Sequence, residues 1–257
     1  EYGPISRKEL SEKTEYSAAT ISNHVKTLIE SGFVIEKEKG TSSGGRRPVY
    51  LTINPNKAYI VGVDIEVSKI KIVLFNLKLK VEKKLEFYIK PDRTSTNILE
   101  DILQYINGIM RENNIEEYDL LGIGVAVPGL VNKERSLLQF APNLGWKKES
   151  ISEFFNQKFK VPIMVENEAN AAGLGEKEFY YDKNINMVYV SINEGIGCGL
   201  IFNGELYRGT SGNAGEFGHI IIESESDRNC HCGNKGCWET LASENYIFDR
   251  YKNITKE

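Results

Sequence analysis

The chain has 257 residues, of which 40% are hydrophobic and 26% charged, and its formal net charge is −4. This is an ordinary balance for a globular protein, and the length allows two or three units with separate cores. No apolar run approaches the ~20 residues that span a bilayer and no signal peptide opens the chain, so we expect a cytoplasmic protein without a membrane partner. The whole chain lacks the net positive charge that is typical of nucleic-acid-binding proteins. Residues 1–55 alone carry eight Lys or Arg against seven Asp or Glu, a balance of +1.

Residues 4–34 predict two short amphipathic helices separated by a polar turn. Ser6 and Glu9 have capping-box spacing at the start of the first helix, and Ser17 is a suitable cap for the second. Gly32 is expected to end the second helix. Apolar residues recur along that helix at helical spacing and predict its buried face: Ala18, Ile21, Val25 and Leu28.

The rest of the second helix is polar and suits contacts to base edges and phosphates in a major groove. The candidate DNA-binding residues on it are Ser17, Thr20, Ser22, Asn23, His24 and Lys26. Predicted strands at 33–37 and 49–53 flank a Gly-rich loop from which Arg46 and Arg47 can reach phosphates or a minor groove. Residues 1–55 therefore indicate a winged helix-turn-helix domain, mostly α with a β wing, that binds operator DNA. The alternative is a helical dimerisation module with a solvated loop.

The composition changes after a short polar linker. Residues 59–75 and 78–89 alternate and are rich in β-branched side chains, which predicts a hairpin-rich sheet. Residues 98–113 have helical spacing, whereas 120–127 and 161–165 are apolar and predict buried strands. Strands, a helix and further strands in this order indicate a mixed α/β domain of the ribonuclease H-like, actin-like type.

Three of the four cysteines lie close together in the sequence: Cys230, Cys232 and Cys237. Gly233 and Gly236 between them let the backbone turn tightly enough for the sulfurs to converge. Cysteine and histidine ligands suit a closed tetrahedral zinc site, which needs one more ligand. His219 is the preferred fourth ligand, because His231 stands between two ligating cysteines and should point away from their centre. The alternative is free thiols or a disulfide, and a stable disulfide is not expected in an intracellular protein.

The runs GEFGH at 215–219 and CHCGNKGCWE at 230–239 resemble the signature of the ROK family, a group of bacterial sugar kinases and sugar-responsive repressors. The resemblance implies an actin-like or hexokinase-like domain over 59–257, with a first lobe at about 59–170 and the start of a second at about 171–257. A family member would continue well beyond residue 257, so the second lobe is expected to be incomplete. The resemblance also implies that the zinc is structural, and that one ring nitrogen of His219 binds it while the other faces a sugar hydroxyl.

The resemblance extends to segments that form the sugar pocket in the family. These are APNLGW at 141–146 and VENEANA at 165–171, and Gly129 allows a close approach of the backbone to a ligand. Carried over to this sequence, the candidate sugar-binding residues are Gly129, Asn143, Asn167, Glu168, Glu216, His219 and Glu239. Trp146 is interpreted as a core aromatic side chain.

Two departures from the family's kinases argue against catalysis, so no catalytic residue is assigned. The kinases carry D-x-G-x-T in the first hairpin, whereas this chain has Asp64-Ile65-Glu66-Val67-Ser68, whose side chains and extra carboxylate oppose a nucleotide phosphate. Glu168 stands where the kinases have an Asp as general base, and the added methylene should weaken proton abstraction. The glycine cluster at 194–199 resembles the second phosphate loop but is interpreted as a tight hairpin turn with Cys198 buried.

The leading hypothesis is a sugar-responsive transcriptional repressor, a homodimer or dimer of dimers that releases operator DNA when a monosaccharide binds. GGRRP at 44–48 and GPIS at 3–6 resemble the DNA-binding half of the family's repressors, and the pocket segments look most like the xylose-repressor branch. The runner-up is an ATP-dependent sugar kinase with a regulatory DNA-binding head. A third alternative is a zinc-stabilised interaction module that binds neither sugar nor DNA.

Overall fold

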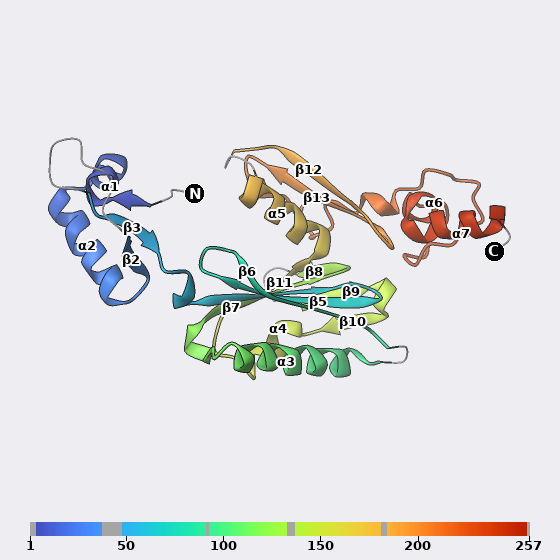
Figure 1. The fold of residues 1–257 in the computed structure, drawn as a ribbon. Helices are drawn as coiled ribbons and strands as arrows, with labels where there is room; N and C mark the ends of the chain where they lie inside the picture. The colour runs from blue at the N-terminus through green and yellow to red at the C-terminus, as the bar shows by residue number, and fades with distance from the viewer. Residues whose placement is uncertain (1–3, 38–47, 91–92, 133–136, 181–183, 256–257) are drawn as a thin grey trace.

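The computed structural model of the chain describes residues 4–37, 48–90, 93–132, 137–180 and 184–255 (Figure 1). Its N-terminal part contains α1 (Arg7–Thr14), α2 (Ala18–Glu30), β1 (Ile5–Ser6), β2 (Val34–Lys37) and β3 (Tyr50–Ile53). The three strands form one antiparallel sheet in the order β1-β3-β2. Both predicted strands are confirmed, and β1 adds an edge that the sequence did not predict. Arg46 and Arg47, on the predicted wing, lie outside the described residues.

Both N-terminal helices begin at the predicted caps. The Ser6 hydroxyl accepts a hydrogen bond from the backbone N–H of Glu9, and the Glu9 carboxylate accepts one from the backbone N–H of Ser6. The Ser17 hydroxyl oxygen accepts a bond from the backbone N–H of Thr20. These bonds satisfy donors that lack an intrahelical partner. After α2, Gly32 takes a φ of 81° and turns the chain away from the helix.

The buried face of α2 differs from the predicted one. Ile21 and Val25 are buried, as expected, but Ala18 is exposed and Leu28 is 43% exposed. Ile29 packs against the buried cluster in place of Leu28. Positions three and four residues after Val25 both lie on its side of the helix, so the spacing alone does not choose between them. The strands β2 and β3, which supply Val34 and Leu51 to the same cluster, decide which of the two residues is buried.

A five-stranded sheet forms the centre of the first lobe, with the order β11-β7-β4-β5-β6. Its strands are β4 (Tyr59–Ile65), β5 (Lys69–Asn76), β6 (Val81–Tyr88), β7 (Leu120–Val127) and β11 (Ile163–Asn167). The first three are antiparallel, and β7 and β11 extend the sheet in parallel with β4. This arrangement confirms the ribonuclease H-like, actin-like fold predicted from the sequence.

The core of the first lobe lies between this sheet and α3 (Ser95–Glu112). Alternate residues of β4 and β5 point inward and are at most 2% exposed: Val61, Val63, Ile65, Ile70, Ile72 and Leu74. Residues of α3 meet them at helical spacing: Ile98, Ile102, Ile106 and Ile109. Each such buried side chain stabilises the fold by roughly 1.5–3 kcal/mol. Trp146 is 5% exposed within this core, which confirms its interpretation as a core aromatic residue.

Smaller elements complete the first lobe. A three-stranded sheet has the order β10-β9-β8 and consists of β8 (Leu130–Asn132), β9 (Leu137–Ala141) and β10 (Trp146–Glu149). The helix α4 (Ile151–Asn156) lies with α3 beneath the large sheet in Figure 1. Single 3-10 turns lie at Pro55–Lys57, Glu117–Asp119, Pro142–Leu144 and Phe217–His219.

The second lobe begins with α5 (Glu168–Tyr180), which lies above the large sheet in Figure 1. It continues with β12 (Met187–Ile192), β13 (Ile196–Phe202), β14 (Glu205–Leu206), α6 (Glu239–Ala242) and α7 (Glu244–Thr255). The strands β12 and β13 form an antiparallel hairpin whose turn contains Gly195, and Cys198 is 3% exposed. The interpretation of the glycine cluster as a hairpin turn is therefore confirmed.

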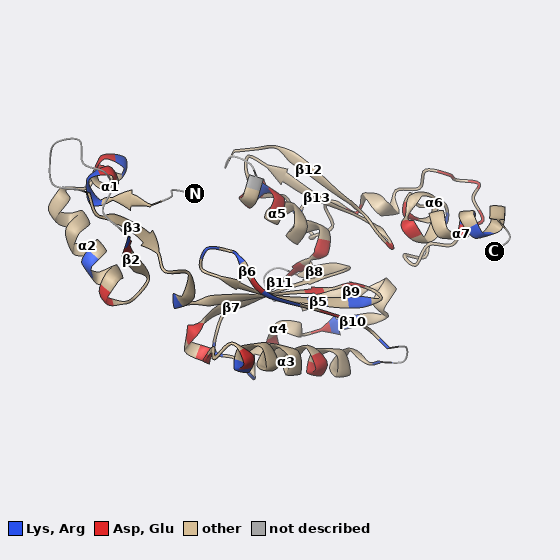
Figure 2. Cartoon of the chain, in the orientation of Figure 1, with Lys and Arg blue, Asp and Glu red and all other residues tan. Residues whose placement is uncertain are grey.

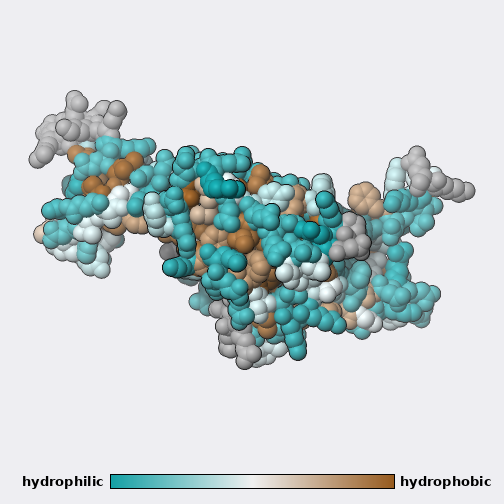
Figure 3. All heavy atoms as spheres, turned by 90° about the horizontal axis from the view of Figure 1, so that it is seen from below, coloured by the Kyte–Doolittle hydropathy of each residue, from teal (hydrophilic) through white to brown (hydrophobic). Residues whose placement is uncertain are grey.

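The surface is mixed in charge and polarity. Both acidic and basic residues lie along α1, whereas those of α3 are mostly acidic (Figure 2). On the face seen from below, hydrophobic side chains gather in the middle of the molecule (Figure 3), and a groove between β6 and α3 is lined by Phe87, Ile98 and Met110. Within the described residues, every helix is too short or too polar to cross a membrane.

Candidate sugar pocket and metal-ligand group

A cavity of about 360 Å³ lies between the two lobes. The first lobe contributes the turn after β7, the 3-10 turn at Pro142–Leu144 and the end of β11. The second contributes the β12–β13 turn and the 3-10 turn at Phe217–His219. All seven candidate sugar-binding residues line it: Gly129, Asn143, Asn167, Glu168, Glu216, His219 and Glu239. The volume falls in the range of small-molecule sites, so segments far apart in the sequence build one polar pocket.

Asn167 joins the two lobes through its side-chain amide. Its Nδ2 donates to the carbonyl oxygen of Gly129 at 3.0 Å, and its Oδ1 accepts from the backbone N–H groups of Ala169 at 2.9 Å and Asn170 at 3.1 Å. The last two bonds cap the N-terminus of α5. Gly129 has a φ of +104°, which favours glycine. Asn167 therefore shapes the cavity, and beyond these bonds it has one amide hydrogen to offer a ligand.

Asn143, in contrast to Asn167, has a side-chain oxygen that is not hydrogen-bonded to any described residue. Its Oδ1 is buried and has no hydrogen-bond partner among the described residues. Gly195 is close by, since a Cβ built on it would lie 3.1 Å from Oε2 of Glu239 and 3.8 Å from Nδ2 of Asn143. A buried acceptor without a partner is costly and rare in folded proteins. Asn143 therefore lines the cavity through its other atoms, because Oδ1 itself is closed to solvent.

Carboxylates gather at one end of the cavity. Burial, followed by the charges of Asp64, Glu66 and Glu194, raises the pKa of Glu168 to about 7. Burial also raises the pKa of Asp64, although Lys71 lies 3.6 Å away and opposes the shift. Glu66 forms an ion pair with the same lysine. The loop at 64–68, which corresponds to the phosphate-binding loop of the kinases, is thus acidic in this chain, and its carboxylates form ion pairs with Lys71.

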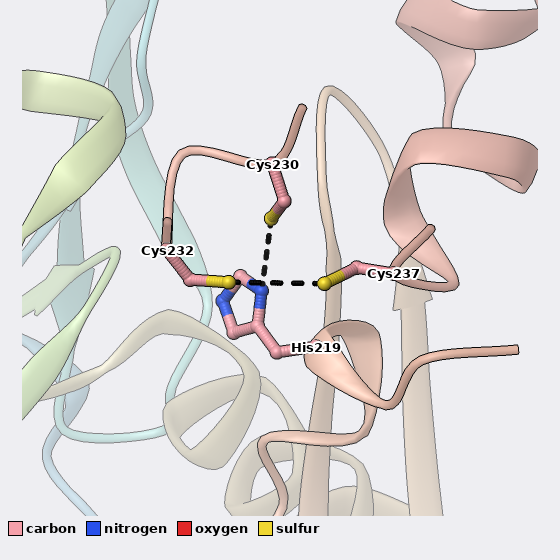
Figure 4. A group of neighbouring side chains, drawn as sticks. All are labelled: His219, Cys230, Cys232 and Cys237. Atoms are coloured by element: carbon pink, nitrogen blue, oxygen red, sulfur yellow. Dashed lines mark hydrogen bonds between the residues drawn. The ribbon is translucent and has the colours of Figure 1, made fainter. Parts of the chain in front are cut away.

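Four ligand atoms converge at the edge of the cavity (Figure 4). They belong to His219, Cys230, Cys232 and Cys237 and all lie within 4.8 Å of one another. Sγ of Cys230 is 3.4 Å from Nδ1 of His219, and Sγ of Cys232 is 3.7 Å from Sγ of Cys237. Two sulfurs that each bind a tetrahedral zinc at about 2.3 Å would lie about 3.7 Å apart. The donor set and its spacing therefore fit a metal ion.

Close backbone packing puts the histidine in place. The turn Phe217–His219 lies against β13, and a Cβ on Gly218 would stand 2.1 Å from the carbonyl oxygen of the first residue of β13. An antiparallel bridge between Ile221 and Cys237 then brings the cysteine loop alongside. His231 is exposed and lies outside the group of ligand atoms. This geometry agrees with the preference for His219.

His219 connects the metal-ligand group to the cavity. Its Nδ1 faces the cysteines, whereas its Nε2 lies 3.8 Å from a carboxylate oxygen of Glu216. The thiol of Cys230 donates to Oε1 of Glu239 at 2.9 Å. Burial raises the pKa of Glu216 and of Cys230, and the bond to Glu239 raises that of Cys230 further. A bound metal requires the Cys230 thiolate, which has no proton to donate to Glu239. The Glu239 carboxylate would then be free to accept a hydrogen bond from a ligand in the cavity.

The cavity also contains residues that the sequence did not assign to it. They include Glu66, Val67, Phe140, Asn193, Glu194 and Asn213. Most of them lie in turns or loops, where polar side chains are common because they hydrogen-bond the nearby backbone, so their presence there does not indicate a binding site. Only the fold shows that the β12–β13 turn faces the end of β11.

The candidate DNA-binding residues of α2 separate into two groups. The exposed positions are Ser17, Ser22, Asn23, His24 and Lys26, whereas Thr20 is half-buried. Three hydroxyl groups are engaged locally: those of Ser17 and Thr20 lie 2.9 Å apart at the helix cap, and that of Ser22 donates to the carbonyl oxygen of Ala18 at 2.8 Å. Lys26 lies 3.8 Å from Glu30, an exposed pair near the C-terminal end of α2 (Figure 2). Asn23, His24 and Lys26 are therefore the exposed candidate side chains outside these local hydroxyl bonds.

These features define a class of two-part proteins. A helix-turn-helix domain precedes an actin-like, hexokinase-like domain whose polar cavity lies between two lobes, beside a His/Cys group. The family model described as ROK family matches residues 60–257, and the model described as HTH domain matches residues 1–45. The chain belongs to the ROK family, and the resemblance found in its sequence is confirmed.

Curated relatives are regulators by name. The chain is 43% identical over 256 residues to the xylose repressor of Bacillus subtilis (strain 168), which covers 99% of this chain and 66% of that protein. It is 32% identical over 262 residues to the DNA-binding transcriptional dual regulator NagC of Escherichia coli (strain K12), which covers 100% of this chain and 63% of that protein. The chain thus spans about two thirds of the length of these relatives.

Solved structures with this fold include both regulators and kinases. A ROK family transcriptional regulator, described as a homolog of the E. coli MLC protein, has a TM-score of 0.76 at 28% identity over 99% of this chain and 64% of that chain. A ROK family glucokinase from Streptomyces griseus, in complex with glucose and AMPPNP, has a TM-score of 0.68 at 28% identity over 77% of this chain and 62% of that chain. The fold alone therefore does not decide between regulation and catalysis.

Proposed function

We propose that this chain is the DNA-binding and sugar-binding part of a sugar-responsive transcriptional repressor. The observation that carries the proposal is that all seven candidate sugar residues line one cavity in a chain that also has a helix-turn-helix domain. The polar side chains of Asn143, Glu216 and Glu239 along the cavity support a ligand with hydroxyl groups. The names of the relatives, a xylose repressor and NagC among them, support a repressor and make xylose the first sugar to test.

The proposed mechanism is a shift between two arrangements of the protein. As a homodimer or dimer of dimers, the repressor presents paired helix-turn-helix domains to an operator with matching half-sites. A sugar that contacts both lobes favours the arrangement in which the lobes close around it, and that arrangement has a different spacing of the DNA-binding domains. The protein then leaves the operator.

The proposed role of the metal is structural. Zinc is the ion that best suits one imidazole and three thiolates. His219 and the three cysteines would hold it, and Nδ1 of His219 would be the ring ligand. This would fix the ring so that Nε2 stays directed at the side of the cavity occupied by Glu216.

The proposal is tested by operator release. We expect His219→Ala to lose both metal binding and sugar-induced release of operator DNA, while operator binding without sugar persists. The matched control is His231→Ala, an exposed histidine of the cysteine loop that is outside the ligand group and does not line the cavity between the two lobes; it should respond to a monosaccharide like the wild type. Full induction of the His219→Ala protein would overturn the proposal.

A second experiment addresses DNA contact. Replacing Lys26 by Ala, or Arg46 and Arg47 by Ala, should weaken operator binding and reduce its salt dependence, because each lost phosphate contact lowers the number of released counterions. An unchanged salt slope in both variants would show that neither α2 nor the predicted wing binds the DNA backbone.

A sugar kinase is the second candidate. The pKa of Glu168 is about 7, which suits a general base near neutral pH. The acidic loop around Asp64 and Glu66 opposes a nucleotide phosphate and favours the repressor. Incubation with xylose, glucose and Mg-ATP distinguishes the two: we expect no sugar phosphate, and turnover that is lost in Glu168→Gln would establish the kinase.

A further inference from the structure

A second cavity, of about 390 Å³, opens beside the first. Four residues line both cavities: Val67, Asn143, Glu194 and Glu239. The two cavities are similar in size, since the first is about 360 Å³. A ligand that fills the first therefore reaches the wall of a second space of comparable volume.

Contacts between three segments build this second cavity. The carbonyl oxygen of Glu194, in the β12–β13 turn, accepts a bond from Nδ2 of Asn245 at 3.3 Å, which ties the turn to the start of α7. On the cysteine loop, the guanidinium of Arg228 lies 4.4 Å from the centre of the Tyr246 ring. Asn229 and Asp249 also line the space. Amide, hydroxyl and aromatic groups of this kind are suited to the hydroxyls and faces of a sugar ring.

The charged residues of the wall disfavour an anionic ligand. The acidic residues Glu194, Glu239 and Asp249 line the second cavity. Arg228 also lines it, and its guanidinium lies over an aromatic ring. The formal charge of these four groups is negative, which repels a phosphate ester and leaves neutral polar ligands.

We propose that the second cavity binds a second saccharide unit, so that the preferred ligand of the site is a neutral disaccharide or longer oligosaccharide whose terminal unit fills the first cavity. This rests on the proposed function, because it requires that the first cavity binds a sugar. Asn143 and Glu239, which line both cavities, would lie beside the glycosidic bond between the two saccharide units.

The test is calorimetric titration of the full-length, zinc-loaded protein with three probes: xylose, the β-1,4-linked disaccharide of xylose, and xylose 5-phosphate. We expect the disaccharide to bind about tenfold tighter than xylose, as two or so added hydrogen bonds would give. Asn229→Trp places a large ring in the second cavity and should return the affinity for the disaccharide to that for xylose. Lys235→Trp is the matched control, because Lys235 is the backbone-bridge partner of Asn229 and lines neither cavity.

Each outcome decides a different point. Equal binding of xylose and the disaccharide would overturn this inference and leave the proposed function intact. Tighter binding of the phosphate ester would also overturn it, because the second cavity would then be an anion site. Absence of binding by all three probes would overturn xylose as the ligand of the first cavity together with the inference. Loss of the disaccharide preference in Asn229→Trp but not in Lys235→Trp supports it.

Discussion

At the scale of single residues, Asn143 and Asn167 of the pocket differ in how their side chains are hydrogen-bonded. Asn167 uses most of its hydrogen-bonding groups on Gly129 and on the first turn of α5. Asn143 has a buried Oδ1 without a partner in the described part of the chain. The first arrangement stabilises the fold, whereas the unpaired oxygen of the second lowers its stability.

The two asparagines therefore predict a contrast between two alanine variants. Asn167→Ala should lower the free energy of unfolding by about 1–3 kcal/mol, because it removes a helix cap and leaves buried groups unpaired. Asn143→Ala should leave the free energy of unfolding within about 1 kcal/mol of wild type and weaken sugar binding about tenfold. Thermal unfolding and titration calorimetry measure the two effects, and equal losses of stability in both variants would contradict the contrast.

Glu168 predicts a pH dependence of stability. Its pKa is about 7 in the folded protein and near 4.5 without the surrounding structure. A raised pKa means that the folded state holds this proton more tightly, so the associated stability is complete below pH about 4.5 and is lost as the pH rises through 7. Without sugar, Glu168→Gln should be more stable than wild type by about 1–3 kcal/mol at pH 8 and lose this advantage near pH 4. A difference that is independent of pH would contradict the assignment.

At the scale of elements, one ion pair joins the lobes next to the pocket. Arg208, which follows β14, donates from Nε to Oε2 of Glu166 on β11 at 3.0 Å and also donates from Nη2. The other oxygen of Glu166 accepts from Nδ2 of Asn170 on α5 at 3.2 Å. The carboxylate thus binds two elements of the second lobe at the point where the chain leaves the first.

This junction predicts a measurable loss of stability. Arg208→Met should lower the free energy of unfolding by about 1–3 kcal/mol, because Glu166 would remain partly buried without its cation. Arg7→Met is the matched control: its pair with Glu36 spans 2.9 Å but its side chains are 34% and 48% exposed, against 22% and 20% for Arg208 and Glu166. Exposed pairs contribute at most about 1 kcal/mol. Equal effects of the two substitutions in denaturant unfolding would argue against a role for the junction.

At the scale of the whole molecule, the described chain has two separate buried clusters. One contains Ile21, Val25 and Leu51 of the N-terminal domain, and the other fills the first lobe. The metal-ligand group belongs to neither, since it lies in the second lobe. The N-terminal domain should therefore keep its fold when the metal site is lost.

Removal of the metal tests this separation. A strong chelator should lower the Tm of the ROK domain by several degrees, because the four ligands would no longer hold the loop at 219–237 in place. Hydrogen exchange should increase in that loop, while the amides of α2 keep their protection. Simultaneous loss of protection in both regions would show that the two domains unfold as one unit.

The sequence by itself determined the local elements whose causes are local. The caps at Ser6 and Ser17, the strands β4 to β7 and the segment of three cysteines follow from hydrogen-bonding groups and periodicity within a few residues. Tertiary structure decided what depends on neighbours: Ile29 packs inward where Leu28 was expected, and α5 was not predicted because its interior glycines weaken the helical signal. The pocket also needed the fold, because Asn143, Glu194 and Glu239 meet only when two lobes are brought together. A sequence pattern records which groups a residue offers, whereas burial and pairing are set by segments distant in the chain.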